Sequence, residues 1–283
     1  MKKVLATVLS CVLAVSCLAG CGSSDAKKAK VVEIELTQEE YAFGVDKTQP
    51  ELLDQVNAFI AEIQENGEFD EICNHYFGDG TPVAVKSAAY DESKDQLVVA
   101  TNAAFEPFEY TQGDSYYGID MEIAAKLADY LGKELVIQNM DFDAVCLSVG
   151  QQKCDIAMAG LTVKEDRKEY VNFTTSYYSA SQKLIVLDGD KDFDDCKDAA
   201  AVEAKLKEKA AAGNVKVGVQ NGTTGQFYVE GDEDWGFEGL GAECVGYKNG
   251  SLAVQDLLNG NITYVIIDSA PAKCITEAIN KMQ

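Results

Sequence analysis

Short apolar runs that alternate with helical patterns place this chain in the α/β class. The runs with strand character are Leu97–Thr101, Leu135–Met140, Asp155–Ala159, Lys183–Leu187, Val215–Gln220 and Tyr264–Asp268. Between the first two runs, residues 119–131 carry an isoleucine or leucine at every fourth position and stop at Gly132, which predicts a helix. Strands that alternate with helices form mostly parallel sheets joined by crossover helices, so we expect that architecture.

Three further helices and one connector follow from the same reasoning. Pro50 begins a helix that ends near Asn66. Residues 198–212 are rich in alanine, lysine and glutamate and predict an exposed helix, and Pro271 begins a final one. Residues 78–95 combine turn residues and charges without an apolar period, which indicates a solvent-exposed linker.

The first residues have the pattern of a bacterial lipoprotein signal. Two lysines follow Met1, an apolar segment runs from Val4 to Ala19, and small residues precede Cys21. Such a signal is cut before the cysteine, which then receives the lipid. A membrane-spanning anchor is the alternative, but this apolar run is short and interrupted by serines and cysteines. We therefore expect residues 1–20 to be removed and Cys21 to hold the protein on the outer face of the cell membrane.

The charge balance excludes one class of partner. The formal net charge is −23 and the isoelectric point is near 4.3. A surface of this sign repels nucleic acid and anionic lipid. A single arginine in a cleft still sets the local field, so the global charge does not exclude an anionic group on a small ligand. The length is sufficient for two modest hydrophobic cores, and we expect two lobes.

Cysteine usage leaves the redox state open. The cysteines beyond the expected lipid site are Cys73, Cys146, Cys154, Cys196, Cys244 and Cys274. Export permits disulfides, whereas the positions of these residues inside apolar periodic segments also suit free thiols. None of them forms a C-x-x-C pair, and the chain has one histidine, which disfavours a zinc site.

Polar side chains with complementary chemistry follow several of the predicted strands. Gly160, Thr162 and Arg167 come after the third strand, and an arginine offers a planar donor fork that fits a carboxylate. Residues 219–225 run from another strand into a helix start whose free amides favour an anion. Asp268 ends a further apolar strand. Because ligands of α/β sheets bind beyond the carboxyl ends of strands, these groups predict a site for a small zwitterion.

Several segments of this chain show a resemblance to a known protein family. In chain order they are ATNAAFEPFEY, YGIDMEIAAKLADYLG, MDFDAV, CDIAMAGLTVKEDRKEYVNFTTSYY, VGVQNGTTG and YVIIDSAPAK. In this order they resemble the solute-binding proteins that serve ABC importers of polar amino acids. The resemblance covers nearly all of the chain after Cys21. It implies a two-lobed periplasmic-binding-protein fold of type II, no cofactor and no enzymatic activity, with a free L-amino acid, an ABC permease and its ATPase as partners.

One departure from the family pattern is the order of the segments. Three segments that come first in this chain resemble the carboxyl-terminal end of family members. They are the stretch EYAFGV, the helix that begins PELLDQVN and the final segment FDEICNHYFG. The resemblance therefore implies a circular permutant whose usual ends are joined by residues 78–95. The implied units are a signal at 1–20, a tether at 21–30, a lobe-2 strand and hinge at 31–40, lobe 1 at 41–186 and lobe 2 at 187–283.

The resemblance also assigns roles to individual residues. Arg167 and Thr162 would hold the ligand α-carboxylate together with Thr223 and Thr224. Asp268 and the Gly160 carbonyl would bind the α-ammonium group. Phe105 and Phe142 would lie beside the ligand side chain, and Asn102 would lie near its tip. Asn102 stands where members that bind cationic side chains often have an acid, which favours a neutral or polar ligand. Glu106 keeps a basic ligand open.

Two other functions compete with transport. Some relatives of this fold are dehydratases that act on carboxylated ring substrates, and such chemistry needs a general acid or base in the cleft. The only histidine, His75, falls in the family's closing helix away from the expected site, which leaves Glu106 as the candidate proton carrier. A ligand-sensing or adhesive binding module is the second alternative.

Overall fold

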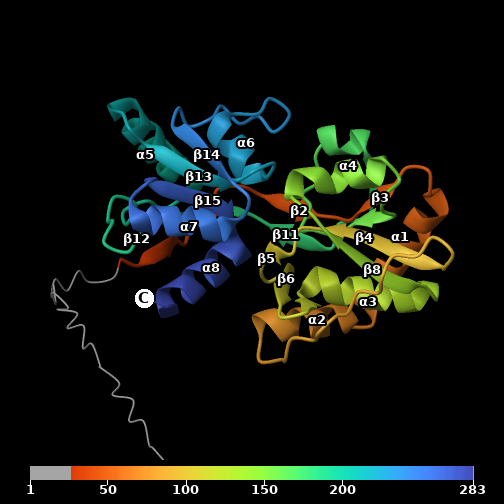
Figure 1. The fold of residues 1–283 in the computed structure, drawn as a ribbon. Coiled ribbons are helices and arrows are strands. Elements are labelled where there is room, and N and C mark those ends of the chain that lie inside the picture. The colour runs from red at the N-terminus through yellow and green to blue at the C-terminus, as the bar shows by residue number, and fades with distance from the viewer. Residues whose placement is uncertain (1–26, 283) are drawn as a thin grey trace, which may run out of the picture.

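The computed structural model describes residues 27–282 and shows two α/β lobes joined by a narrow hinge (Figure 1). Each lobe is built on a five-stranded sheet flanked by helices. The predicted signal, most of the tether and the lipid site at Cys21 lie outside the described residues. Within residues 27–282, no helix combines the length and the apolar composition needed to cross a membrane.

The sheet of lobe 1 has the strand order β10-β3-β9-β4-β8. These strands are β10 (Val171–Phe173), β3 (Gly44–Asp46), β9 (Ile156–Ala157), β4 (Gln96–Thr101) and β8 (Glu134–Asn139). All six residues of β4 are buried because the strand lies inside the sheet and is covered on both faces. A small sheet beside it contains β5 (Ala104–Phe105), β6 (Glu109–Gln112) and β7 (Ser115–Tyr117).

The sheet of lobe 2 has the strand order β1-β12-β15-β13-β14. These strands are β1 (Ala29–Val32), β12 (Gln182–Leu187), β15 (Tyr264–Asp268), β13 (Lys216–Gln220) and β14 (Glu243–Tyr247). β1 pairs antiparallel with β12, so the opening segment of the described chain is an edge strand of this lobe. It runs from Ala29 to Val32 and so begins two residues before the strand-and-hinge unit expected at 31–40.

The hinge consists of two antiparallel strands, β2 (Glu39–Tyr41) and β11 (Tyr178–Ala180). The strand that follows β11 is β12, which belongs to the sheet of lobe 2. The lobe boundary therefore falls at β11, and the expected boundary after residue 186 is corrected by one strand. The sequence pattern of an apolar strand is the same in either lobe. Only the strands with which it pairs reveal the lobe to which it belongs.

Both sheets are mixed, which corrects the expectation of mostly parallel sheets. β4 runs parallel to β8 and β9, and β13 runs parallel to β14 and β15. In contrast, β3 and β12 run antiparallel to their neighbours. These two strands enter their lobes directly from the hinge rather than through a crossover helix, and a chain that enters from the opposite end reverses the strand direction.

The helices of the two lobes are α1 (Pro50–Glu65), α2 (Glu68–Phe77), α3 (Ile119–Leu131), α4 (Val145–Gly150), α5 (Ala199–Ala212), α6 (Thr224–Glu230), α7 (Gly250–Asn259) and α8 (Ser269–Met282), with short 3-10 turns η1 (Phe142–Ala144) and η2 (Asp166–Glu169). The predicted helices correspond to α1, α3, α5 and α8, each within two residues of its expected start. Gly132 ends α3 in the left-handed conformation, and the Asp198 carboxylate caps α5.

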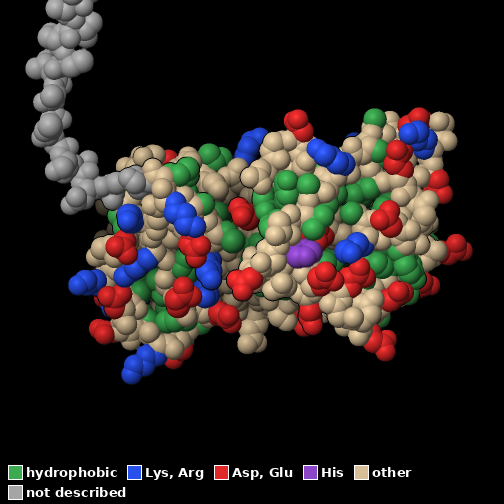
Figure 2. Space-filling model, turned by 90° about the horizontal axis from the view of Figure 1, so that it is seen from below, with side chains coloured by type: hydrophobic (Ala, Val, Ile, Leu, Met, Phe, Trp, Pro, Cys, Tyr) green, Lys and Arg blue, Asp and Glu red, His purple; other side chains and the backbone are tan. Residues whose placement is uncertain are grey.

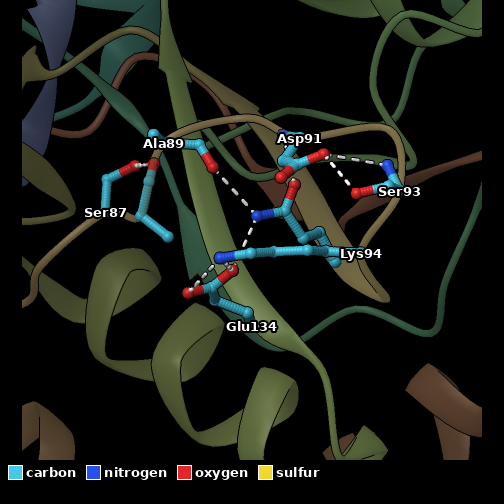
Figure 3. A network of polar contacts seen from close by, with 8 residues as sticks. Ser87, Ala89, Asp91, Ser93, Lys94 and Glu134 are labelled. Atoms are coloured by element: carbon cyan, nitrogen blue, oxygen red, sulfur yellow. Dashed lines mark hydrogen bonds and ion pairs between the residues drawn. The ribbon is translucent and has the colours of Figure 1, made fainter.

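The linker at 78–95 is exposed over most of its side chains, but its backbone is fixed to lobe 1. Val85 is buried and exchanges backbone hydrogen bonds with Tyr116. Figure 3 shows the end of the linker, where Asp91 binds Ser93 and Lys94 reaches Glu134 (Figure 3). The Gln96 amide donates to the Ala89 carbonyl at 2.9 Å and to Glu134 at 2.7 Å. The connector is therefore an ordered strap along the edge of β8.

The surface and the thiols add two observations. Figure 2 shows acidic and basic side chains interspersed over one face, with no single-sign patch that would suit nucleic acid (Figure 2). The six cysteines between residues 27 and 282 are free thiols. Burial raises the pKa of Cys73 and Cys244 to about 12, because the thiolate loses its hydration there.

Candidate functional site

The candidate site lies where the strand ends of the two lobes meet in front of the hinge. Three hydrogen bonds cross directly between the lobes at this place. They join Gln220 Nε2 to Asn102 Oδ1 at 3.1 Å, Arg167 Nη2 to the Gly222 carbonyl at 2.8 Å, and Thr224 Oγ1 to Thr162 Oγ1 at 3.4 Å. The structure is therefore a closed form in which polar groups from both lobes meet one another.

Gly160 forms the tight corner of the lobe-1 half. Its φ of +54° lies in the left-handed region, and a Cβ there would lie 3.0 Å from the Phe105 ring and 3.3 Å from the Tyr41 ring. Its backbone N–H donates to Asp120 Oδ2 at 2.9 Å. Glycine is required here because the backbone conformation and the two aromatic rings leave no room for a side chain.

Arg167 spans the two lobes through backbone carbonyls. Nη1 donates to the Thr162 carbonyl at 2.6 Å, while Nη2 donates to Gly222. The guanidinium group lies 5.3 Å from the centre of the Phe142 ring, a cation–π distance. Arg167 and Phe142 also line a cavity of roughly 290 Å³ that extends from the site. The structure thus places Phe142 against the arginine.

The lobe-2 half is built on the turn after β13. Thr223 is the N-cap residue of α6, and its hydroxyl donates to the Gln220 carbonyl at 2.8 Å. Both Thr223 and Thr224 are buried. The sequence prediction brought these two threonines together with Thr162 and Arg167, and all four lie within this one region of the closed structure.

Asp268 ends β15 and faces the hinge. Its Oδ1 accepts a hydrogen bond of 2.5 Å from the Tyr41 hydroxyl, and its side chain is buried. Burial and the neighbouring Glu39 carboxylate raise the pKa of Asp268 to about 7. The group is therefore close to its titration point at neutral pH.

Glu39 is a carboxylate in the site that the sequence analysis missed. It lies on β2, and its Oε2 accepts from the Thr162 hydroxyl at 2.8 Å. Its Oε1 accepts from the Thr37 hydroxyl at 2.6 Å and from Gln182 Nε2 at 3.0 Å. The hinge strand thus brings Glu39 and Tyr41 to the site, and neither residue was predicted as a site residue.

Two further carboxylates lie deeper in lobe 1. Asp120 accepts from the Tyr177 hydroxyl at 2.6 Å, and burial raises the pKa of Asp120 to about 7. Glu109 is fully buried, and within the described part of the chain neither of its oxygens has a hydrogen-bond partner. Burial, and then Asp120 and Asp268, raise the pKa of Glu109 well above its usual range, which favours the protonated form of this side chain.

Of the remaining residues named by the sequence analysis, Asn102 and Phe105 lie at the site and Glu106 does not. Asn102 is buried and donates from Nδ2 to the Met140 carbonyl at 2.6 Å, with Oδ1 directed to Gln220. Phe105 packs beside Gly160. Glu106 is exposed and lines an outer groove with Asn249 and Cys274, so it does not reach the site.

Known proteins resemble this chain in both sequence and fold. Residues 97–277, well over half of the chain, match the model for bacterial extracellular solute-binding proteins, family 3. The chain belongs to this family. Among curated relatives, the arginine-binding extracellular protein ArtP of Bacillus subtilis is 32% identical over 105 residues, which are 37% of this chain and 41% of ArtP. The histidine-binding periplasmic protein of Salmonella typhimurium is 27% identical over 188 residues, 66% of this chain and 65% of the relative.

Solved structures of this solute-binding family share the fold. The Gly52Ala mutant of arginine-bound ArgBP from T. maritima has a TM-score of 0.56 and 28% identity, covering 66% of this chain and 79% of that chain. The fold is the two-lobed type II periplasmic-binding-protein fold. The chain spans less than two thirds of the length of the two curated relatives named above.

Proposed function

We propose that this member of family 3 captures a free L-amino acid between its lobes and delivers it to an ABC importer at the outer face of the cell membrane. One observation carries the proposal: an arginine, paired threonine hydroxyls and an aspartate from two lobes converge at the strand ends in front of the hinge. These groups complement an α-carboxylate at one end and an α-ammonium at the other. The names of the two curated relatives are those of arginine-binding and histidine-binding proteins, and both amino acids carry these two groups.

The ligand α-carboxylate is proposed to bind to Arg167, Thr162, Thr223 and Thr224. The α-ammonium group is proposed to bind to Asp268 and to the Gly160 carbonyl. On this proposal the ligand takes over polar contacts that now join the lobes directly. A ligand that gains bonds only when the lobes are together stabilises the closed form, which links capture to hinge closure.

A thermal-shift screen of the twenty amino acids, with a soluble form that starts after Cys21, tests the function. A ligand that binds only the folded protein raises the unfolding midpoint. For the ligand found, Arg167→Ala and Asp268→Ala are expected to weaken calorimetric binding at least ~100-fold, since each leaves a charged ligand group buried without its partner. Lys168→Ala and Asp195→Ala, both at exposed positions, serve as matched controls. Unchanged binding by both site variants would remove this site.

The ligand side chain is proposed to be neutral or polar, because the Asn102 amide both donates and accepts within the site. A basic side chain is the second candidate. It is favoured by the arginine named in two of the matched proteins. L-arginine and L-histidine are therefore to be measured beside the uncharged amino acids.

We infer that the protein is not a dehydratase. His75 Nδ1 lies 2.9 Å from Glu122 in a network between α2 and α3, and Glu106 lies on the outer groove. Neither side chain faces the residues that are proposed to hold a ligand. Mass spectrometry of a carboxylated ring substrate after incubation with the protein is expected to show no loss of water.

Membrane attachment through Cys21 and the circular permutation belong to the same proposal. The permutation is supported by the strap at 78–95, which runs from the end of α2 to the start of β4 along lobe 1. Metabolic labelling with a fatty acid is expected to mark the wild type and not a Cys21→Ser variant. Equal labelling of both would contradict the lipoprotein assignment.

A further inference from the structure

Glu39 and Asp268 form a pair of buried carboxylates at the hinge end of the cleft. The two side chains come from β2 and β15, and Glu39 is close enough to raise the pKa of Asp268. Within residues 27–282, no lysine or arginine forms an ion pair with either carboxylate. Two buried acids without a cation are unfavourable, because each loses hydration and repels the other.

Gln182 contacts both acids through its side chain, and its amide oxygen is a further acceptor at this place. Its Nε2 donates to Glu39, and its side chain also reaches Asp268, its cross-strand partner. The Gln182 side chain is fully buried, and its Oε1 has no hydrogen-bond partner among residues 27–282. A buried amide oxygen without a donor costs free energy that a ligand N–H removes.

Thr162 adds a constraint on the ligand's orientation. A hydroxyl group has one proton, and Thr162 gives it to Glu39. An ammonium group that takes over this contact with Glu39 frees the Thr162 proton for the ligand α-carboxylate. The hinge end of the site thus offers a ligand the acceptor oxygens of Glu39, Asp268 and the Gln182 amide, and it complements a group that has several N–H donors.

We propose that Glu39 is a ligand-binding residue that, together with Asp268 and Gln182, holds the α-ammonium group of the amino acid. This inference rests on the proposed function and adds a second carboxylate to its ammonium subsite. A three-donor ammonium group satisfies both acids and the amide oxygen at once. Because Glu39 belongs to the hinge strand, the same contact joins ligand binding to the element about which the lobes move.

The test compares Glu39→Gln with Glu40→Gln, its exposed neighbour on the same strand, so both variants change the charge equally. The probes are the amino acid that gives the wild type the largest thermal shift and its Nα-acetyl derivative, which lacks the ammonium charge. Glu39→Gln is expected to raise the dissociation constant of the free amino acid at least ~10-fold, while Glu40→Gln leaves it unchanged.

The acetyl derivative separates an ammonium contact from a structural role. The measured quantity is the ratio of the dissociation constant of the acetyl derivative to that of the free amino acid. Glu39→Gln is expected to reduce this ratio by the same factor, and Glu39→Asp is expected to restore part of the ratio. Equal weakening of both probes, or unchanged or tighter binding of the free amino acid, would overturn the inference. If the wild type binds no amino acid, the proposed function fails before Glu39 is reached, and the two failures are thus distinguishable.

Discussion

Buried acids are the main feature of this protein at the residue scale. Asp120, Asp268 and Glu109 are buried, and the pKa of each is raised, that of Glu109 in part by the other two. In the unfolded chain these carboxyls regain water and their ordinary pKa. The folded protein therefore binds more protons than the unfolded chain between roughly pH 4 and pH 7.

This difference predicts a pH-dependent stability of the unliganded protein. Because the folded state binds more protons in that window, the free energy of unfolding falls as pH rises through it. The thermal midpoint is expected to be higher at pH 5 than at pH 8. Differential scanning calorimetry of the wild type, Asp268→Asn and the exposed control Asp195→Asn measures the effect. Asp268→Asn is expected to flatten the profile, and a wild-type midpoint that rises with pH would contradict the reasoning.

At the scale of elements, the turn from β7 into α3 controls the packing of lobe 1. Gly118 has a φ of +124°, and a Cβ there would lie 2.0 Å from the Phe108 carbonyl oxygen. Its N–H donates to the Tyr76 hydroxyl at 2.9 Å, and Tyr76 in turn donates to Glu122 at 2.5 Å. The turn therefore joins α2, α3 and the small sheet through backbone contacts that a side chain would break.

Gly118→Ala is expected to lower the free energy of unfolding by about 3 kcal/mol or more, since the clash is with backbone rather than with a flexible side chain. Gly113→Ala is the matched control. It also has a positive φ, of +60°, but a Cβ there meets nothing within 4 Å, so about 1 kcal/mol is expected from backbone strain. Urea unfolding measures both values, and equal losses would show that the contact with Phe108 is unimportant.

At the scale of the whole molecule, a buried lysine holds the lobes together. Lys164 of lobe 1 lies 3.1 Å from Asp232 and 4.7 Å from the centre of the Phe227 ring, both in lobe 2. It also pairs with Asp166 in its own lobe at 3.0 Å. The lysine side chain is 5% exposed, so salt screens its contacts less than those of the exposed interlobe pair Lys248–Asp141.

Lys164→Met is therefore expected to favour the open form. Small-angle scattering should show a larger radius of gyration without ligand, and ligand dissociation should be ~3–10-fold faster, since Asp232 loses its buried partner. Lys168→Met is the control, because Lys168 is more exposed and pairs with Glu165 of the same lobe. An unchanged radius and dissociation rate in Lys164→Met would show that closure does not depend on this contact.

The proposed permutation makes a separate prediction for the whole molecule. Ala29 and Asn280 exchange two hydrogen bonds, of 3.0 Å and 2.8 Å, so the two ends of the described chain lie side by side. A chain cut at 91–94 in the strap and rejoined from Met282 to Lys27 by a short glycine-serine linker is expected to fold with the same circular dichroism and ligand binding. Failure of this relinked chain to fold would contradict the permutation.

The sequence by itself determined the main strands and four of the helices, because apolar spacing is a local property. It predicted α3 from leucine and isoleucine spacing and β15 from an apolar run, and it brought Arg167, Thr162 and Asp268 together through strand ends and family resemblance. Only the tertiary structure revealed which sheet contains β12, how the sheets mix strand directions, and that Glu39 and Tyr41 enter the site. The reason is sequence distance: Glu39 meets Thr162 across 123 positions and Tyr41 meets Asp268 across 227, and no local pattern encodes contacts between residues that only folding brings together.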